Sequence, residues 1–195
     1  MRILAQSNRR LALFISIFLT LFSTIIVTTI IGTTPATASS HASTLKNLDM
    51  NEIMFAQGMI PHHQQAIDMS NMALKNGASA EIKKLAKGII SAQQKEISQL
   101  KYWLTATKSS MTMDHDMGMD GMLSKGDLAA LKNLKGANFN TAFLKAMIAH
   151  HEGALEMVAL LDGTENAEAK KIAGDILKGQ SAEITFMKKL LTKSK

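Results

Sequence analysis

The chain has 195 residues but no cysteine, and it contains only two prolines, one tryptophan and one tyrosine. Without cysteine, neither a disulfide nor a thiolate metal site is possible. Aromatic residues make up 5% of the chain, although 46% of it is hydrophobic. That mix favours helices packed with Leu, Ile, Ala and Met over a β-sandwich, because strands are enriched in aromatic residues. The length suits one domain with appendages.

Long basic clusters are also missing, since Lys and Arg occur singly or in pairs. The formal net charge of +6 includes three arginines within residues 1–38, which contain no acidic residue, so the rest of the chain carries +3. A mildly basic chain without a basic cluster does not support nucleic-acid binding.

The N-terminus has the pattern of an export signal. Arg2, Arg9 and Arg10 precede an apolar run over residues 11–31, and the small-x-small sequence Ala36-Thr37-Ala38 follows it. The pattern predicts a signal peptide over residues 1–38, which places the mature chain in the periplasm or outside the cell. The apolar run is just long enough to span a bilayer, so an uncleaved membrane anchor is the alternative.

Two repeated patterns organise the remaining residues, 39–195. Met59-Ile60-Pro61-His62-His63 returns as Met147-Ile148-Ala149-His150-His151. A second pattern consists of Glu-x-Lys-Lys-x-Ala followed by Gln-x-x-Glu-Ile. It starts at Glu81 and again at Glu168. Because each copy joins one His-His segment to one Gln-x-x-Glu segment with helical periodicity, the chain is predicted to be all-α: an antiparallel four-helix bundle made of two duplicated helical hairpins.

Capping signals set the expected helix boundaries. Pro61 lies inside the first helix, which is expected either to kink there or to be two abutting helices. Gly136 is expected to end a short helix between the two hairpins. The predicted helices run from Leu48–Asn51 to Lys75 with Asp49 or Asn51 as N-cap, from Ala80 to Thr105 after Ser79, from Ser124 to Leu134, from Asn138 or Asn140 to Leu161, and from Thr164 or Asn166 to Leu191.

Between the hairpins, residues 107–124 form a predicted Met- and His-rich crossover loop. Methionine in a solvated loop gains nothing from burial, so core packing does not explain its frequency here. Thioether sulfur is a soft donor that favours copper(I) or silver(I) over hard cations. The candidate metal ligands of this loop are Met111, Met113, His115, Met117, Met119 and Met122.

The two His-His segments are the second candidate metal sites. In each copy a Met, two His and a trailing Met recur at helical spacing, and thioether with imidazole again favours copper(I). The alternative is that the methionines fill the core and the histidines form structural hydrogen bonds, and the trailing methionines are left open between packing and ligation. These candidates are Met59, His62, His63, Met69, Met147, His150, His151 and Met157.

For two further groups of residues, a structural role is the preferred interpretation. Gln93, Glu96, Gln180 and Glu183 are expected to be a polar helix flank, with the alternative that they orient the histidines as hydrogen-bond partners. Met50, Met54 and Met72 are expected to pack in the core, although Met50 and Met54 could make a surface site with His41.

Around both His-His pairs the chain resembles the bacterial domain-of-unknown-function family 305. The residues that carry the resemblance are Met-Ile-Pro-His-His-Gln-Gln-Ala-Ile-Asp-Met from Met59 and Met-Ile-Ala-His-His-Glu-Gly-Ala-Leu-Glu-Met from Met147. The resemblance implies a ferritin-like four-helix bundle. Similarity to copper-binding members implies that copper(I) and silver(I) are bound outside the cytoplasm through these Met and His residues, in copper resistance. Pro61 is matched by Ala149 and Gln65 by Gly153, so the two copies need not bind alike.

The predicted function is therefore to sequester or deliver copper(I), with silver(I) or copper(II) as further ions and without enzymatic activity. A copper efflux or sensor protein is the expected partner, and a membrane is expected only if the N-terminal segment stays attached. One alternative is a metal-dependent oxidase of ferritin-like type, against which the missing Glu-x-x-His motif argues. The other alternative is a helical module that binds a partner without metal.

Overall fold

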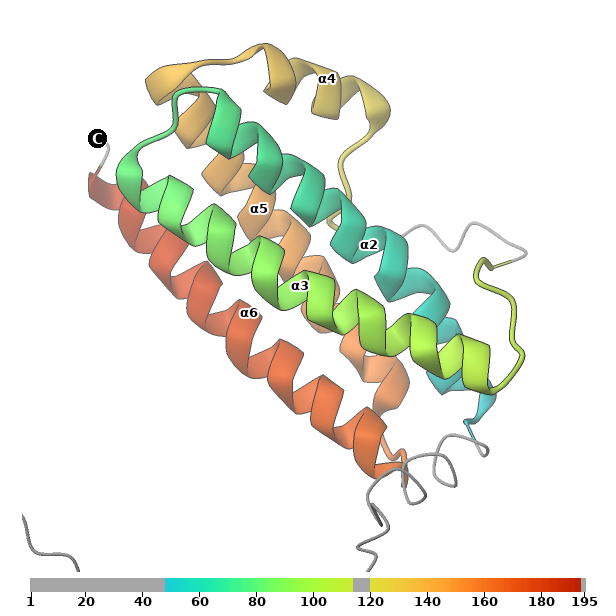
Figure 1. Ribbon diagram of the computed structural model, residues 1–195. Coiled ribbons are helices and arrows are strands. Elements are labelled where there is room, and N and C mark those ends of the chain that lie inside the picture. Colours follow the sequence, from blue (N-terminus) through green and yellow to red (C-terminus); the bar gives the residue numbers. More distant parts are fainter. Residues whose placement is uncertain (1–47, 114–119, 194–195) are drawn as a thin grey trace, which may run out of the picture. The chain divides into compact units, whose positions relative to one another are not determined.

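The computed structural model describes residues 48–113 and 120–193, and the regular structure of these residues is entirely helical (Figure 1). The prediction of an all-helical bundle is confirmed. No helix among these residues is both long and apolar enough to cross a membrane. The predicted signal peptide lies outside the described residues. The elements are α2 (Met50–Lys75), α3 (Ala80–Ala106), α4 (Lys125–Asn133), α5 (Gly136–Met157), the 3₁₀ helix η1 (Val158–Leu161) and α6 (Ala167–Lys193).

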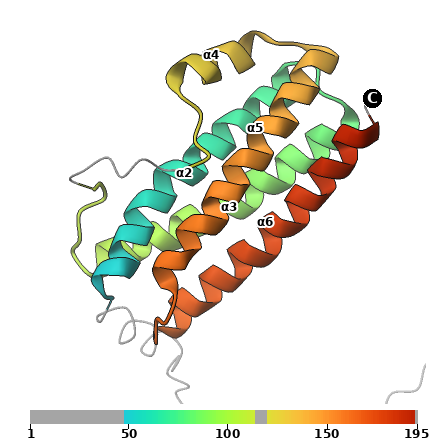
Figure 2. The same ribbon diagram turned by 180° about the vertical axis from the view of Figure 1, so that it is seen from behind.

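The four long helices lie side by side in two views from opposite directions (Figures 1 and 2). Helices α2 and α3 form one hairpin, and α5 and α6 form the other. The turn of each hairpin is bonded to the first helix of the other hairpin: Ser79 N donates to Asn140 Oδ1 at 3.3 Å, and Thr164 Oγ1 donates to buried Glu52. Each end of the bundle is thus tied by a hydrogen bond between one hairpin turn and the first helix of the other hairpin.

The predicted N-caps are largely confirmed. Asp49 and Glu52 form a reciprocal capping box at the start of α2, with bonds of 2.8 and 2.9 Å. The Ser79 and Ser124 side chains cap α3 and α4, and Asn166 Oδ1 accepts from the first turn of α6 at 3.0 Å. These bonds satisfy backbone N–H groups that a helix leaves unpaired at its N-terminus.

At Pro61 the structure excludes one of the two predicted alternatives, and at Gly136 it revises a helix boundary. Helix α2 passes through Pro61 as one continuous helix, so it is not two abutting helices, and Pro61 lies on its exposed side. Helix α5 starts at Gly136, before the predicted Asn138 or Asn140, and Gly136 does not end α4. Gly136 has a φ of 55°, which a residue without Cβ adopts readily, and its N–H donates to Asn76 O at 3.1 Å. This bond lets the chain turn directly into α5.

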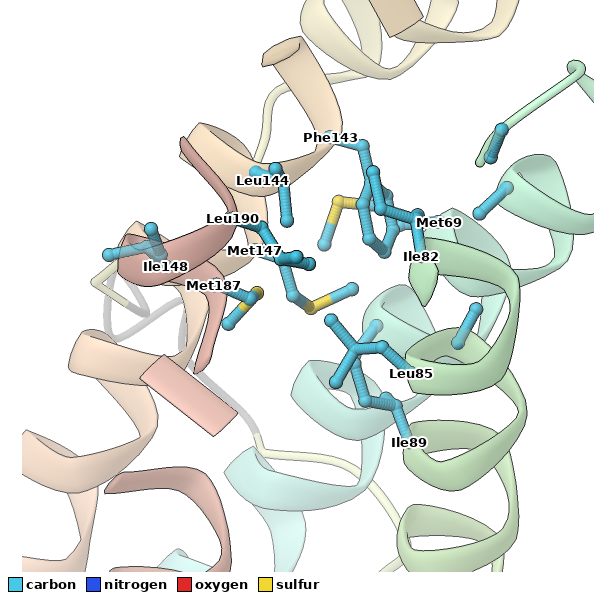
Figure 3. Close-up of a cluster of buried hydrophobic side chains, with 14 of the residues drawn as sticks. Met69, Ile82, Leu85, Ile89, Phe143, Leu144, Met147, Ile148, Met187 and Leu190 are labelled. Atoms are coloured by element: carbon cyan, nitrogen blue, oxygen red, sulfur yellow. The ribbon is translucent and has the colours of Figure 1, made fainter. Parts of the chain in front are cut away.

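The apolar core consists of two clusters. The first cluster includes Met69, Leu85, Phe143, Met147 and Met187, several of which Figure 3 shows with their sulfur atoms among aliphatic and aromatic side chains. The second cluster is built around Trp103 and includes Phe55, Met59, Leu100, Val158 and Ile172. On α2 the histidine pair lies between Met59 of the second cluster and Met69 of the first, and α5 has the same order in reverse. The histidines therefore occupy a layer between two apolar clusters.

The duplication is broken where the crossover segment returns to the bundle. A Cβ atom at Gly153 would collide with the carbonyl oxygen of Asp120, so a glycine is needed on α5. At the equivalent position of α2, Gln65 Nε2 donates to Leu123 O at 2.9 Å and its Oε1 accepts from Leu123 N at 2.7 Å. The mismatch between Gln65 and Gly153 thus holds residues 120–123 against both α2 and α5.

Gly153→Ala is expected to lower the free energy of unfolding by about 1–3 kcal/mol, because backbone must move to admit the methyl group. Gly174→Ala is the matched control in α6, where a Cβ would meet nothing within 4 Å. The control should raise the free energy of unfolding by up to about 1 kcal/mol, through helix propensity alone. Urea denaturation measures both values, and stabilisation by Gly153→Ala would contradict the close packing of residues 120–123.

Candidate metal centre

The structure brings the four motif histidines together in one buried layer. All four side chains are fully buried, and the His62 and His150 rings, one from each hairpin, have centroids 3.8 Å apart with an interplanar angle of 41°. Neighbouring rings on the same helix are farther apart, at 6.5 Å for His62–His63 and 6.3 Å for His150–His151. We call this group the histidine layer.

The outer histidines each contact a carboxylate from the second helix of their own hairpin. His63 Nε2 lies 2.7 Å from Glu96 Oε2, and His151 Nε2 is hydrogen-bonded to Glu183 Oε2 at 2.8 Å. The expectation that Glu96 and Glu183 form only a polar flank is therefore wrong, and the alternative of histidine orientation is the one the geometry supports. The signal was already in the sequence, because both glutamates belong to the repeated Gln-x-x-Glu pattern.

The histidine layer contains many polar atoms without a hydrogen-bond partner among the described residues. The Nδ1 atom of every one of the four histidines is buried in this state, and so is Nε2 of His150. Nε2 of His63 also lacks a hydrogen bond, because its 2.7 Å contact with Glu96 does not have hydrogen-bond geometry. Both amide atoms of Gln93 and of Gln180 are buried without partners too. Leaving a buried polar group unpaired costs about 1–3 kcal/mol, so this layer is suited to receive a polar or ionic guest.

Burial keeps the central pair of histidines uncharged. Desolvation lowers the pKa of His62 to about 4, with the bond to the Asp120 carbonyl acting in the opposite direction and neighbouring histidines adding a smaller depression. Desolvation likewise lowers the pKa of His150 to about 2, and charge repulsion from the other three histidines contributes. At neutral pH each ring therefore keeps a nitrogen lone pair, which is the form that binds a metal ion.

The predicted methionine ligands of the bundle lie in the apolar clusters. Met59, Met69 and Met147 are fully buried there, and Met157 packs against the second cluster. Packing accounts for these positions, and coordination by their sulfur atoms stays a prediction. In the described residues, no three His, Asp or Glu side chains converge as ligands of one ion. The histidine layer is thus a ring pair with two flanking His–Glu pairs, and not a preformed set of His and carboxylate ligands.

The loop methionines differ from those of the bundle in exposure. Met111 is 45% exposed, and Met113 and Met122 are partly exposed. His115, Met117 and Met119 lie outside the described residues. Met72 is partly buried against the first cluster, as core packing requires, and Met54 is partly buried. Met50, at 68% exposure, is not a core residue. Its place in the first turn of α2 directs it to solvent, so core packing of Met50 was a wrong expectation.

Acid should destabilise the protein through the central histidines. Their folded pKa values lie below 6.5, so stability is full above pH 6.5 and is lost as the pH falls toward 4, because only the unfolded chain takes up these protons. The loss at pH 4 should be on the order of 3 kcal/mol for each histidine. Urea denaturation between pH 7 and pH 4 should show a smaller loss in a His62→Leu/His150→Leu variant. Equal losses in both proteins would contradict the assigned burial.

Comparisons with known proteins agree with the helical fold. The fold is similar to that of a putative secreted DUF305 protein from Streptomyces coelicolor, at 26% identity and a TM-score of 0.70, over 74% of this chain and 93% of that one. It is also similar to CopM in a Cu(II)-bound form, at 36% identity and a TM-score of 0.64, over 73% of this chain and 96% of CopM.

A Cu(I)-bound form of CopM matches at 36% identity with a TM-score of 0.61, over the same shares of both chains. An uncharacterized protein of Acanthamoeba polyphaga mimivirus is 37% identical over 59 residues, which span 30% of this chain and only 39% of the viral protein. The family model for the domain of unknown function DUF305 matches residues 52–191, which include both hairpins and the histidine layer. The chain therefore belongs to the DUF305 family.

Proposed function

We propose that this protein binds copper(I) outside the cytoplasm, and silver(I) as a chemically similar ion, in order to sequester copper or deliver it. The observation that carries the proposal is the buried histidine layer with its unpaired ring nitrogens. The proposal is supported by CopM, a relative at 36% identity that has Cu(I)-bound, Cu(II)-bound and silver-bound forms.

The chemistry of the available donors fits a soft or borderline ion. Neutral imidazole binds copper in either oxidation state, and thioether sulfur prefers copper(I) and silver(I). Calcium and magnesium require several oxygen ligands, and the histidine layer offers nitrogen atoms with only two carboxylates, already engaged by His63 and His151. The residues present thus suit copper better than a hard divalent cation.

Two groups of metal-donor atoms differ in their access to solvent and have different roles in copper binding. The loop methionines, of which Met111 is the most exposed described member, offer reachable sulfur for rapid capture and exchange of ions. The histidine layer is closed off from solvent and offers slower, more protected binding. A protein with both groups is able to take up copper at the loop and retain it in the bundle, or pass it from the loop to a copper efflux or sensor protein.

Binding is favoured over catalysis for this chain. A ferritin-like di-iron oxidase requires inward Glu-x-x-His pairs, and the sequence contains no such pair. Export of the mature chain by the signal peptide over residues 1–38 would place it where copper(I) enters the cell and where Met replaces Cys as the soft ligand. A partner-binding module without metal is the remaining alternative, and it predicts no response to copper(I).

An anaerobic copper(I) titration against a competing chelator tests the proposal. Changing Met111, Met113, Met117, Met119 and Met122 to Leu should remove the rapidly exchanging sites, while Met50→Leu, the control at an exposed methionine outside the loop, should leave them unchanged. Changing all four layer histidines to Leu should remove the protected sites. Copper(I) at a hundredfold excess over Kd should stabilise the wild-type fold by about 2.7 kcal/mol.

The contrary result is equally clear. A wild-type protein that competes no copper(I) away from the chelator, and whose unfolding midpoint does not move with copper(I), is not a copper-binding protein. Iron bound to the purified protein would instead favour the oxidase alternative.

A further inference from the structure

We propose that Glu96 and Glu183 are positioning residues that fix the protons of His63 and His151 on Nε2, so that the Nδ1 atoms of these histidines are the metal-binding nitrogens. The donor role of Nδ1 rests on the proposed copper function. The proton position does not, because it is a property of the metal-free protein.

The contacts at the Nε2 atoms give the first step. A carboxylate oxygen accepts hydrogen bonds, so a neutral imidazole beside it carries its proton on the nitrogen that faces the carboxylate. Nε2 of His151 is hydrogen-bonded to Glu183 at 2.8 Å. Nε2 of His63 lies 2.7 Å from Glu96 without hydrogen-bond geometry, so there the negative charge of the carboxylate is what favours a proton on Nε2. In this tautomer the lone pair of each ring is on Nδ1.

The surroundings of the Nδ1 atoms give the second step. Nδ1 of His63 and Nδ1 of His151 are both buried without a hydrogen-bond partner among the described residues. The two rings come from different hairpins, so the same atom is left unpaired twice. His62 follows the same rule, because its Nε2 lies 3.3 Å from the Asp120 carbonyl oxygen, another acceptor, and its Nδ1 is unpaired. Acceptors at Nε2 and open lone pairs at Nδ1 are thus a shared property of these three rings.

Gln93 and Gln180 are further buried polar side chains on the helices that carry the positioning glutamates. Each lies one helical turn before the positioning glutamate, on α3 and on α6, and each is at least nine-tenths buried with its whole amide unpaired. A metal ion with bound water would supply both an electron-pair acceptor for Nδ1 and hydrogen-bond partners for the amides. An apolar guest would supply neither.

The glutamates also suit this role electrostatically. A carboxylate behind a metal-bound imidazole raises the basicity of the ring and fixes its orientation. Glu96 and Glu183 are 18% and 25% exposed, so their charges keep part of their hydration while their inner oxygens reach the buried rings. Their negative charge offsets the positive charge of an ion within the bundle, where an uncompensated charge is strongly unfavourable.

The first test is the tautomer of the metal-free protein, purified after expression of the full chain and labelled with ¹⁵N. Long-range ¹H–¹⁵N correlation spectra at pH 7.5 should show the ring proton of His63 and of His151 on Nε2 and no proton on Nδ1, with resonances assigned by His63→Gln and His151→Gln. Rings protonated on Nδ1, or on both nitrogens, would overturn the inference whether or not the protein binds copper.

The second test changes the glutamates. Glu96→Leu/Glu183→Leu should release the tautomer and raise the Kd for copper(I) by about 10–100-fold, as loss of such hydrogen-bond partners does at other metal sites. Glu96→Gln/Glu183→Gln keeps an oxygen that accepts from Nε2, so it should keep the tautomer and restore most of the affinity. Glu165→Leu is the control, since Glu165 is 96% exposed and pairs with Lys170 on the surface.

Silver(I), which is diamagnetic, identifies the donor atom directly. Its addition to the wild-type protein should shift the Nδ1 resonances of His63 and His151 much more than the Nε2 resonances. Silver(I) binding that shifts Nε2 instead, or that shifts neither ring, would overturn the donor assignment. A wild-type protein that binds neither copper(I) nor silver(I) would overturn the proposed function, while the tautomer measurement would still decide the role of the glutamates.

Discussion

Four imidazole rings have lost their water in the middle of this bundle, and the surrounding structure has to compensate for that loss. The rings of His63 and His151 contact the carboxylates of Glu96 and Glu183 in place of water. These glutamates reach inward from the second helix of each hairpin. The central rings, those of His62 and His150, stay neutral and lie 3.8 Å apart with a tilt of 41° between their planes. The apolar clusters on either side anchor the helices that hold these rings, so the stability of the fold and the chemistry of the layer depend on the same packing.

The sequence duplication accounts for most contacts within and between the two hairpins, and the exceptions to it have their own structural reason. A hydrogen bond ties each hairpin turn to the first helix of the other hairpin, and equivalent carboxylates face equivalent histidines. Gln65 and Gly153 depart from the repeat because a single crossover segment lies against two similar helices, and one needs a hydrogen-bonding side chain where the other needs no side chain at all. At this position the repeat is therefore broken because the crossover segment has no second copy in the chain.

Helical periodicity, the capping residues and the repeat were sufficient to predict the bundle, its hairpins and most helix ends. They were also sufficient to single out the histidines. They could not show that Met59 and Met147 would point into opposite apolar clusters, because a helical face does not say which neighbour covers it. The roles of Glu96 and Glu183 required the distance between two helices, and the early start of α5 at Gly136 depended on a bond to another turn.

The polar layer between two apolar clusters also fixes how the helices align along their axes. A slip of one helix by a single turn, about 5.4 Å, would move an imidazole into hydrocarbon and a methionine opposite a carboxylate. Apolar side chains alone would tolerate such a slip more easily, since one aliphatic contact replaces another. The histidines therefore specify one alignment of the two hairpins, as a buried polar residue specifies the register of a coiled coil.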